Sequence, residues 1–312
     1  MILFDAVQKQ VRNSVLVTGA EGFLGRAFVR LLERSYQRVI SLDSIQPAVT
    51  EERSTTTKIR CDITNQQQLE KVFRDYEIGT IVHLAAILPT AAQRDPVRAT
   101  RVNVVGSVNL LELARQFGVA RFVFGSSLSI YGSCSPDHFV SESDRAAPED
   151  VYGAAKLYVE QMGKALTGSG LVQFVSLRIG RVVGPGAHST TSAWRSAIFE
   201  LLQTSRPASL TLPYVGSERV LLIHVQDAAG ALMTLLQAPR PAHCIYNAPC
   251  ESWVVNDLKL QLQSLNPNIR VALGDAHANG NPRLLDWSRF KNEFAFSTTS
   301  IAERLRTAAG TI

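Results

Sequence analysis

The sequence has few charged residues, and its basic residues do not gather in one segment. Charged side chains make up 19% of the 312 residues, and 32 basic against 27 acidic side chains give a formal net charge of +5. A nucleic-acid-binding arm typically carries a block of Lys and Arg, whereas here they are spread along the chain. We therefore expect no nucleic-acid partner.

The sequence also lacks paired cysteines and long apolar runs. Its four cysteines, Cys61, Cys134, Cys244 and Cys250, form no C-x-x-C pair. A chain of this size needs no disulfide scaffold, so we expect free thiols and no metal site. The first residues reach Asp5 without the features of a signal peptide, and no apolar run approaches the roughly 20 residues of a membrane span. These absences predict a cytoplasmic protein with no membrane partner.

Apolar residues are plentiful, at 46% of the chain, so a large core can form. The first half alternates short apolar runs with helix-like segments, which predicts βαβ crossovers and a doubly wound parallel sheet. We expect an α/β fold, with an NAD-binding Rossmann domain over residues 1–183. Residues 184–312 should form a smaller, mostly substrate-binding C-terminal lobe, with some segments returning to the core. Strands are predicted at 14–17, 39–42, 57–60, 80–84, 121–125, 172–177, 220–224 and 245–247, and helices at 99–116, 193–203 and 300–309.

A glycine-rich turn, from Thr18 to Gly25, follows the first strand and precedes a helical pattern. Its glycines let the backbone approach a ligand closely, and the new helix presents N–H groups to an anion such as a dinucleotide pyrophosphate. The spacing is G-x-x-G-x-x-G, and a lone glycine motif is weak evidence. Support comes from Asp43, which ends the second strand and can bind ribose hydroxyls. Its carboxylate would repel a 2′-phosphate, so NAD is favoured over NADP, although Asp43 can also be read as a turn residue.

Tyr152 and Lys156 stand in a Y-x-x-x-K pattern on a helix that opens near Asp150. One helical turn brings them to the same face, where the ammonium can favour the phenolate and let tyrosine act as a base nearer neutral pH. The structural alternative is a tyrosine packed under the sheet beside a lysine with a buried stem. Ser127 and Ser129 follow the fifth strand, where small hydroxyls can orient a substrate oxygen or simply end the strand.

These motifs resemble the extended short-chain dehydrogenases/reductases, also called the NAD-dependent epimerase/dehydratase family, over essentially the whole chain. The glycine turn is similar to T-G-x-x-G-[FY]-[IL]-G, His83 to Ala86 to H-x-A-A, and Ile223 to Asp227 to I-H-V-x-D. The resemblance implies NAD as cofactor and hydride transfer with Ser127, Tyr152 and Lys156 as catalytic residues. Lys156 would also bind the nicotinamide ribose. The cofactor contacts that we expect are Gly19, Gly22, Phe23, Leu24, Gly25, Asp43, Asp62, Ile63, Leu84, Ala85, Ala86, Asn103, Tyr152 and Lys156.

Departures from the family pattern bear on the substrate. Leu128 and Ser129 stand where sugar-nucleotide dehydratases carry Asp-Glu, so dehydration is not expected. Val220 and Ala272 align with the arginines that grip a nucleotide-sugar diphosphate, and Arg219 or Arg270 could replace them only after a register shift.

Arg181 replaces a ligand-facing asparagine and suits a substrate carboxylate or phosphate. It is the strongest of three candidate cations, because Arg195 can equally be a solvated helix residue and His188 a loop residue. The substrate-binding residues that we predict are Ser127, Ser129, Arg181, His188 and Arg195.

Three functions fit these residues. The first is an NAD-dependent dehydrogenase acting on a secondary alcohol or ketone of a sugar-like or hydroxy-acid substrate. The second is an NDP-sugar 4-epimerase of the UDP-glucose type, and the third is a non-catalytic NAD-sensing protein. Sequence does not separate net oxidation from epimerisation, because that depends on whether the keto intermediate leaves. The expected partners are a small-molecule substrate and a second copy of the chain in a homodimer.

Overall fold

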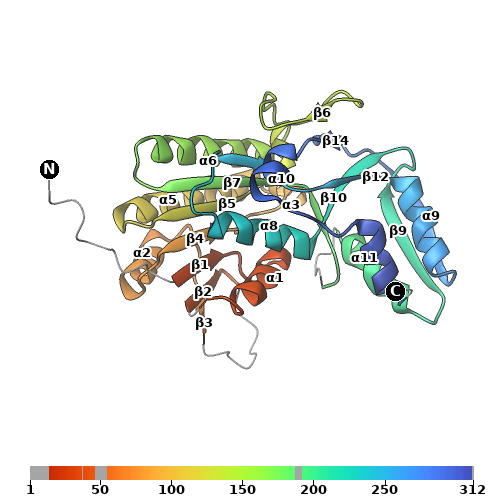
Figure 1. Ribbon diagram of the computed structural model, residues 1–312, viewed down its shortest axis with the longest axis horizontal. Helices are drawn as coiled ribbons and strands as arrows, with labels where there is room; N and C mark the ends of the chain where they lie inside the picture. Colours follow the sequence, from red (N-terminus) through yellow and green to blue (C-terminus); the bar gives the residue numbers. More distant parts are fainter. Residues whose placement is uncertain (1–13, 37, 46–54, 187–191, 311–312) are drawn as a thin grey trace.

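The computed structural model describes residues 14–36, 38–45, 55–186 and 192–310. At its centre lies a seven-stranded sheet with the order β11-β7-β5-β4-β1-β2-β3 (Figure 1). All neighbouring strands are parallel, so the expected doubly wound α/β sheet is confirmed. The strands are β1 (Ser14–Thr18), β2 (Arg38–Asp43), β3 (Thr56–Arg60), β4 (Thr80–His83), β5 (Arg121–Ser127), β7 (Gln173–Ile179) and β11 (Ile245–Asn247).

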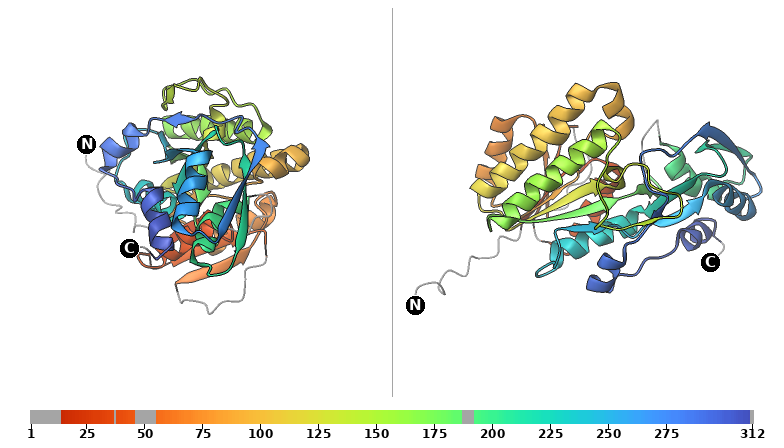
Figure 2. Two further views of the ribbon diagram at one scale, coloured as in Figure 1. Left: turned by 90° about the vertical axis from the view of Figure 1, so that its right-hand side faces the viewer. Right: turned by 90° about the horizontal axis from the view of Figure 1, so that it is seen from above.

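Helices cover both faces of this sheet (Figure 2). On one face, α1 (Phe23–Leu32) and α8 (Val225–Gln237) pack in an apolar cluster with Val15 and Val17. On the other face, a second cluster joins Leu16 to α2 (Gln66–Asp75), α5 (Ser107–Gln116) and α6 (Val151–Gly168). Successive strand residues thus point to opposite faces and are buried on both, which explains the continuous apolar runs in the sequence.

The helix predicted at 99–116 is divided. The structure has α3 (Pro89–Arg94), α4 (Pro96–Thr100), a π-helical turn at Arg101–Gly106 and then α5. Gly106 packs closely on Ile63, because a Cβ on Gly106 would lie 2.6 Å from that side chain. The Ser107 hydroxyl donates to the carbonyl of Asn103 at 2.7 Å, a bond of the kind that distorts helices. The π turn is where Asn103 lies, and such turns are frequent at functional sites.

The C-terminal part forms smaller sheets, with β9, α9 and α11 at one end of the molecule, at the right of Figure 1. A third apolar cluster, which includes Trp194, Leu212 and Val220, holds these elements together. The sheet orders are β12-β10-β8, β13-β9 and β14-β6. The elements are β6 (Phe139–Val140), β8 (Arg181–Val183), α7 (Trp194–Glu200), β9 (Ala208–Tyr214), β10 (Arg219–His224), β12 (Glu251–Val254), α9 (Val255–Leu265), β13 (Ile269–Ala276), β14 (Leu284–Leu285), α10 (Ser288–Phe294) and α11 (Ile301–Ala308), with short 3₁₀ turns at Leu128–Ile130 and Leu201–Gln203.

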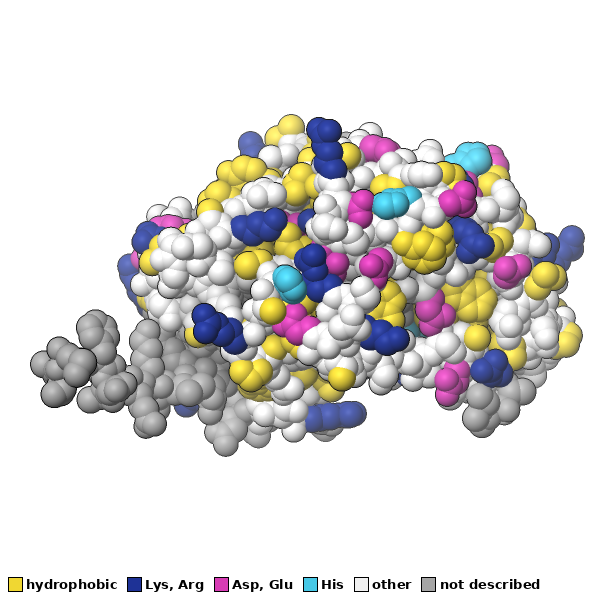
Figure 3. Space-filling view, turned by 45° about the horizontal axis from the view of Figure 1, so that its top comes forward, with side chains coloured by type: hydrophobic (Ala, Val, Ile, Leu, Met, Phe, Trp, Pro, Cys, Tyr) yellow, Lys and Arg dark blue, Asp and Glu magenta, His cyan; other side chains and the backbone are white. Residues whose placement is uncertain are grey.

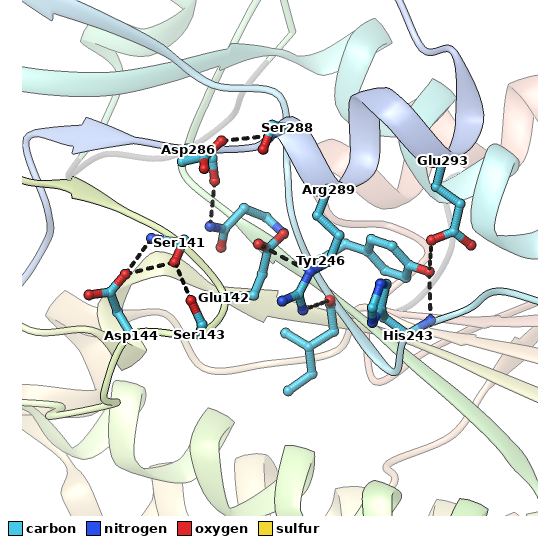
Figure 4. A network of polar contacts seen from close by, with 12 residues as sticks. Ser141, Glu142, Ser143, Asp144, His243, Tyr246, Asp286, Ser288, Arg289 and Glu293 are labelled. Atoms are coloured by element: carbon cyan, nitrogen blue, oxygen red, sulfur yellow. Dashed lines mark hydrogen bonds and ion pairs between the residues drawn. The ribbon is translucent and has the colours of Figure 1, made fainter.

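A polar network fixes the edge strand β11 to the segments around β6, β14 and α10 (Figure 4). The backbone N–H of Asn247 donates to Glu142 at 2.7 Å, and its side-chain amide donates to the carbonyl of Asp286 at 2.9 Å. Arg289 donates to the carbonyl of Ile245 at 3.1 Å. The sheet edge is therefore covered by polar partners from the same chain rather than left open for strand pairing.

The surface carries charges of both signs, and the cysteines are not joined in disulfides. On the face drawn in Figure 3, acidic and basic side chains are interspersed. All four cysteines are free thiols. Within the described ranges, no helix has the length and apolar character to span a bilayer, and no group of three or more His, Cys, Asp or Glu residues is placed to hold a metal ion.

Candidate active site

The glycine loop between β1 and α1 has the geometry of an anion cradle. Gly19 has a φ of +69°, and a Cβ there would come within 2.5 Å of the backbone nitrogen of Ala85. A Cβ on Gly25 would overlap the carbonyl of Gly19. The N-cap of α1 is Gly22, which has no side chain to cap the helix, so the first N–H groups of α1, from Phe23 onward, suit a pyrophosphate.

The carboxylates predicted to contact the adenosine half lie at the ends of β2 and β3. Asp43 is held beside the glycine loop, because its side chain accepts hydrogen bonds from the backbone N–H groups of Glu21 at 3.0 Å and Ile45 at 3.1 Å. Asp62 is exposed and accepts from the N–H of Thr64 at 2.9 Å. The next residue, Ile63, is buried.

A buried hydrogen-bond relay connects β1, β4 and the π turn. The Thr18 hydroxyl lies 2.6 Å from Nδ1 of His83, and Nε2 of His83 lies 2.8 Å from the Ser107 hydroxyl. Since Ser107 gives its proton to the carbonyl of Asn103, it accepts from Nε2–H, which leaves Nδ1 to accept from Thr18. Burial, with the charge of Lys156 as a smaller cause, lowers the pKa of His83 to about 3, so the ring is neutral at pH 7.

The relay ends at the loop after β4, which carries the predicted cofactor contacts Leu84, Ala85 and Ala86. The amide of Asn103 accepts from the N–H of Ile87 at 2.7 Å and donates to the carbonyl of Ile87 at 2.9 Å. Asn103 therefore holds this loop through the Ile87 backbone, and we expect it to support cofactor binding by positioning the loop.

The three catalytic candidates come from β5 and α6. Ser127 ends β5, and its hydroxyl lies 3.1 Å from that of Ser129 and beside that of Tyr152. Asp150 caps α6 by accepting from the N–H of Gly153 at 2.6 Å, which fixes the helical turn that carries Tyr152. Both Tyr152 and Lys156 are buried, and the Lys156 ammonium lies 5.5 Å from the Tyr152 ring centre.

The electrostatics of this pair differ from the sequence expectation. Burial and the charge of Asp150 raise the pKa of Tyr152 to about 12, while Arg195 and Ser127 lower it. Burial lowers the pKa of Lys156 to about 7. Lys156 is not among the groups that lower the pKa of Tyr152, so the expectation that it moves the tyrosine pKa toward neutrality is wrong. The Lys156 ammonium instead donates to the carbonyl of Gly125 at 2.7 Å.

The predicted substrate-binding arginines lie on the C-terminal side of the site. Arg181 on β8 donates from Nε to the hydroxyl of Tyr214 at 3.1 Å, and its guanidinium carbon lies 5.4 Å from that ring. Arg195 on α7 is half-buried, with its guanidinium 5.9 Å from the ring of Trp194. His188 lies outside the described residues.

The two positions aligned with diphosphate-binding arginines are Val220 and Ala272. Val220 is buried in β10, while Arg219 beside it is exposed and donates weakly to Ser252 at 3.5 Å. Ala272 and Arg270 on β13 are both exposed. Both arginines that could replace these positions are therefore exposed on their strands.

Sequence reasoning missed a buried ion pair behind the site. Arg178 on β7 donates to Glu160 on α6 at 2.7 Å, and its guanidinium lies 4.7 Å from the Tyr131 ring. Glu160 follows Lys156 by one helical turn and favours its charged form. The spacing of Lys156 and Glu160 was the available signal.

Sequence reasoning also missed Arg26 on α1. It donates to the carbonyl of Gly186 at 2.9 Å and so joins α1 to the segment after β8.

The parallel sheet and the glycine loop define a dinucleotide-binding α/β protein. A model of the NAD dependent epimerase/dehydratase family matches residues 15–248, and the chain belongs to this family. The resemblance stated from the motifs is confirmed. Because NAD-dependent enzymes make up the family, the expected cofactor and the expectation of an enzyme are confirmed at the level of the family.

Curated relatives agree with this assignment. The UDP-glucose 4-epimerase of Erwinia amylovora is 32% identical over 158 residues, which cover 48% of this chain and 47% of the relative. The chain spans about half the length of this 4-epimerase and of the one from Halalkalibacterium halodurans. An uncharacterized epimerase/dehydratase of Staphylococcus haemolyticus is 24% identical over 91% of this chain and 92% of its own length.

Solved structures support the fold over nearly the whole chain. The L-threonine dehydrogenase of Clostridium difficile superposes with a TM-score of 0.85 at 19% identity, covering 96% of this chain and 97% of that one. The UDP-glucose 4-epimerase of Thermus thermophilus, solved with NAD, gives a TM-score of 0.79 at 25% identity, covering 95% and 98%.

Proposed function

We propose that this protein is an NAD-dependent oxidoreductase that transfers hydride at a secondary alcohol or ketone of a small sugar-like or hydroxy-acid substrate. One observation carries the proposal. The hydroxyls of Ser127 and Tyr152 and the ammonium of Lys156 meet at the carboxyl end of β5. Ligands of doubly wound sheets bind at this end, beside the glycine loop.

Each residue has a distinct task in this proposal. When bound, NAD supplies the hydride acceptor, and the glycine loop with Asp43 would hold its pyrophosphate and adenosine ribose. Ser127 orients the substrate hydroxyl. Tyr152 removes the hydroxyl proton, and Lys156, anchored on Gly125, binds the nicotinamide ribose. Residues 184–312 would contribute most of the substrate contacts.

A 4-epimerase is the second candidate, because curated relatives such as that of Erwinia amylovora carry this activity in their names. The buried Val220 and the exposed Ala272 weigh against it, since neither side chain can bind a diphosphate as arginine does. The intact Ser127, Tyr152 and Lys156 weigh against a non-catalytic NAD sensor.

We further propose that the protein forms a homodimer and is located in the cytoplasm.

The test is NADH formation on a panel of polyols, sugar acids, hydroxy acids and UDP-sugars. Tyr152→Phe should lower turnover by about 10²- to 10⁴-fold while NAD still binds, because the ring stays and the acid/base oxygen is lost. Tyr158→Phe is the matched control, since Tyr158 lies on the same helix with 50% of its surface exposed. Near-normal turnover in Tyr152→Phe contradicts the proposal. Interconversion of UDP-glucose and UDP-galactose without net NADH would support the epimerase.

A further inference from the structure

Arg195 holds a buried guanidinium nitrogen for which the structure shows no acceptor. Its backbone is fixed, because its carbonyl accepts from the N–H of Gly184 at 3.0 Å and Ser196 donates to the carbonyl of Gly184 at 2.8 Å. Its Nε has no hydrogen-bond partner among the described residues. A buried donor without an acceptor is unfavourable, so it marks a place where an acceptor from a ligand is expected.

Two other arginines have a buried nitrogen of this kind, but their charges are paired. Arg178 forms an ion pair with Glu160, and Arg304 forms one with Asp227. No carboxylate forms an ion pair with Arg195 in the part of the chain that the structure describes. The positive charge of Arg195 is therefore left uncompensated among the described residues, whereas those of Arg178 and Arg304 are neutralised.

Arg181 lies across an aromatic pair from Arg195. The rings of Trp194 and Tyr214 meet edge to face at 6.1 Å, with Arg195 against Trp194 and Arg181 against Tyr214. Arg181 already gives its Nε proton to Tyr214, whereas the Nε of Arg195 is unused. Burial first, and then the charge of Arg181, lower the pKa of Arg195, so the two cations repel each other. An anion between them would relieve this repulsion.

The position of Arg195 places this anion close to the reacting group. Ile179, just before β8, pairs with Ser127 at the end of β5, and the N–H of Gly184, just after β8, donates to the carbonyl of Arg195. These contacts bring the segment that carries Arg195 to the end of the sheet where Ser127 and Tyr152 lie, which agrees with the effect of the arginine charge on the tyrosine pKa. A group bound by Arg195 is thus on the side of the alcohol that Tyr152 would deprotonate. A planar carboxylate fits the fork of a guanidinium, and a hydroxy acid carries its carboxylate only a few bonds from its alcohol.

We infer that Arg195, with Arg181 beside it, binds the carboxylate of a small hydroxy acid or sugar acid next to Tyr152. This inference rests on the proposed oxidoreductase function and narrows its substrate class. It also reverses the order predicted from the sequence. Arg195 makes the contact, while Arg181 positions Tyr214 and adds positive charge.

The test compares acids with neutral counterparts by titration calorimetry on the NAD-loaded protein. The probes are gluconate with sorbitol, glycerate with glycerol, and UDP-glucose. At least one acid should bind more tightly than its counterpart. Arg195→Met should weaken that acid by about ten- to a hundredfold and the neutral compound by less than about twofold, as expected for a charge-assisted contact. Arg195→Lys should restore part of the affinity, because it keeps the charge but not the fork.

Two controls keep the result interpretable. Arg206→Met removes an exposed arginine just beyond the same helical segment and should leave acid binding unchanged. The NAD affinity of each variant reports whether the cofactor site is still folded.

Three outcomes overturn the inference. The acids bind no more tightly than their neutral counterparts, Arg195→Met weakens the binding of acid and neutral compound equally, or UDP-glucose binds more tightly than the acids. Acid binding that depends on Arg195 without any turnover on the full panel would contradict the proposed oxidoreductase activity and leave the anion site standing.

Discussion

The hydroxyl of Thr18, at the end of β1, lies 2.6 Å from Nδ1 of His83, at the end of β4. Both side chains are fully buried. This bond joins the two strands whose ends carry the glycine loop and the Leu84 loop, so the two loops that we propose for cofactor binding are held at a fixed separation. This buried pair can thus affect how well a pyrophosphate fits in the glycine loop.

Replacing Thr18 by valine keeps the side-chain shape and removes the hydroxyl. The buried Nδ1 of His83 then loses its donor, which we expect to reduce the free energy of unfolding by about 1–3 kcal/mol and to weaken NAD binding. Urea unfolding and NAD titration measure the two effects. Thr100→Val, at an exposed threonine on α4, is the control and should change neither. Unaltered NAD affinity in Thr18→Val would show that the relay does not support the loop.

Gly19→Ala tests the close approach of the glycine loop to β4. A Cβ at this position meets the backbone of Ala85, and the backbone has a positive φ. Gly170 has a φ of +73° with open space around its Cβ position, so Gly170→Ala reports the conformational cost alone, about 1–2 kcal/mol. We expect Gly19→Ala to lose more stability than Gly170→Ala and to lose NAD binding. Equal losses would mean that no clash exists.

Asp43→Ala tests cofactor choice. The Asp43 carboxylate lies beside the glycine loop, where it can accept from ribose hydroxyls and oppose a 2′-phosphate. The preference for NAD over NADP should fall by roughly tenfold or more, measured as the ratio of the two dissociation constants. Asp62→Ala, at the end of β3, should leave this ratio closer to that of the wild type. Tighter binding of NADP than NAD by the unaltered protein would refute the role of Asp43.

The sequence was sufficient for the sheet because each buried strand is a short apolar run between turn residues, such as Val15 to Val17 before Gly19. Motif spacing likewise identified Tyr152 and Lys156 on α6. The π turn at Asn103 could not be predicted, since it depends on the packing of Gly106 against Ile63, which is distant in the chain.

The environment of each candidate cation could not be predicted from the sequence either. Arg181 meets Tyr214 and Arg178 meets Glu160 only after the strands and helices have assembled. The pKa of Tyr152 reflects burial and the nearby Asp150 more than its helical partner. Motifs therefore identified the candidate residues, whereas tertiary contacts determine their charge states and partners.

Arg178→Met tests the buried pair behind the site. It leaves the Glu160 carboxylate buried without its cation, and we expect a loss of about 3–5 kcal/mol in the free energy of unfolding. Adding Glu160→Gln should recover part of this loss, because the amide still accepts from Ser176 but carries no charge. Arg115→Met, at an exposed pair with Glu112, should leave the urea midpoint almost unchanged. A double variant no more stable than Arg178→Met would show that packing, not charge, holds this position.

The pH dependence of oxidation tests the electrostatics of Tyr152 with two variants of opposite sign. Tyr152 must lose its proton to act as a base, so turnover should fall as the pH drops below its pKa. The charge of Asp150 raises this pKa and that of Arg195 lowers it. Asp150→Asn should therefore move the acidic limb of the profile to lower pH, and Arg195→Met should move it to higher pH.

Both variants of this pair leave the supporting structure in place. Asparagine can still cap α6 by accepting from Gly153, so the helix should not unwind in Asp150→Asn. Lys156 and Ser127, the other proposed catalytic residues, are unchanged in each variant. The measurement is kcat against pH at saturating substrate and NAD, which removes the effect of Arg195 on substrate affinity. Shifts in the same direction, or no shift in either variant, would show that the limb reports a group other than Tyr152.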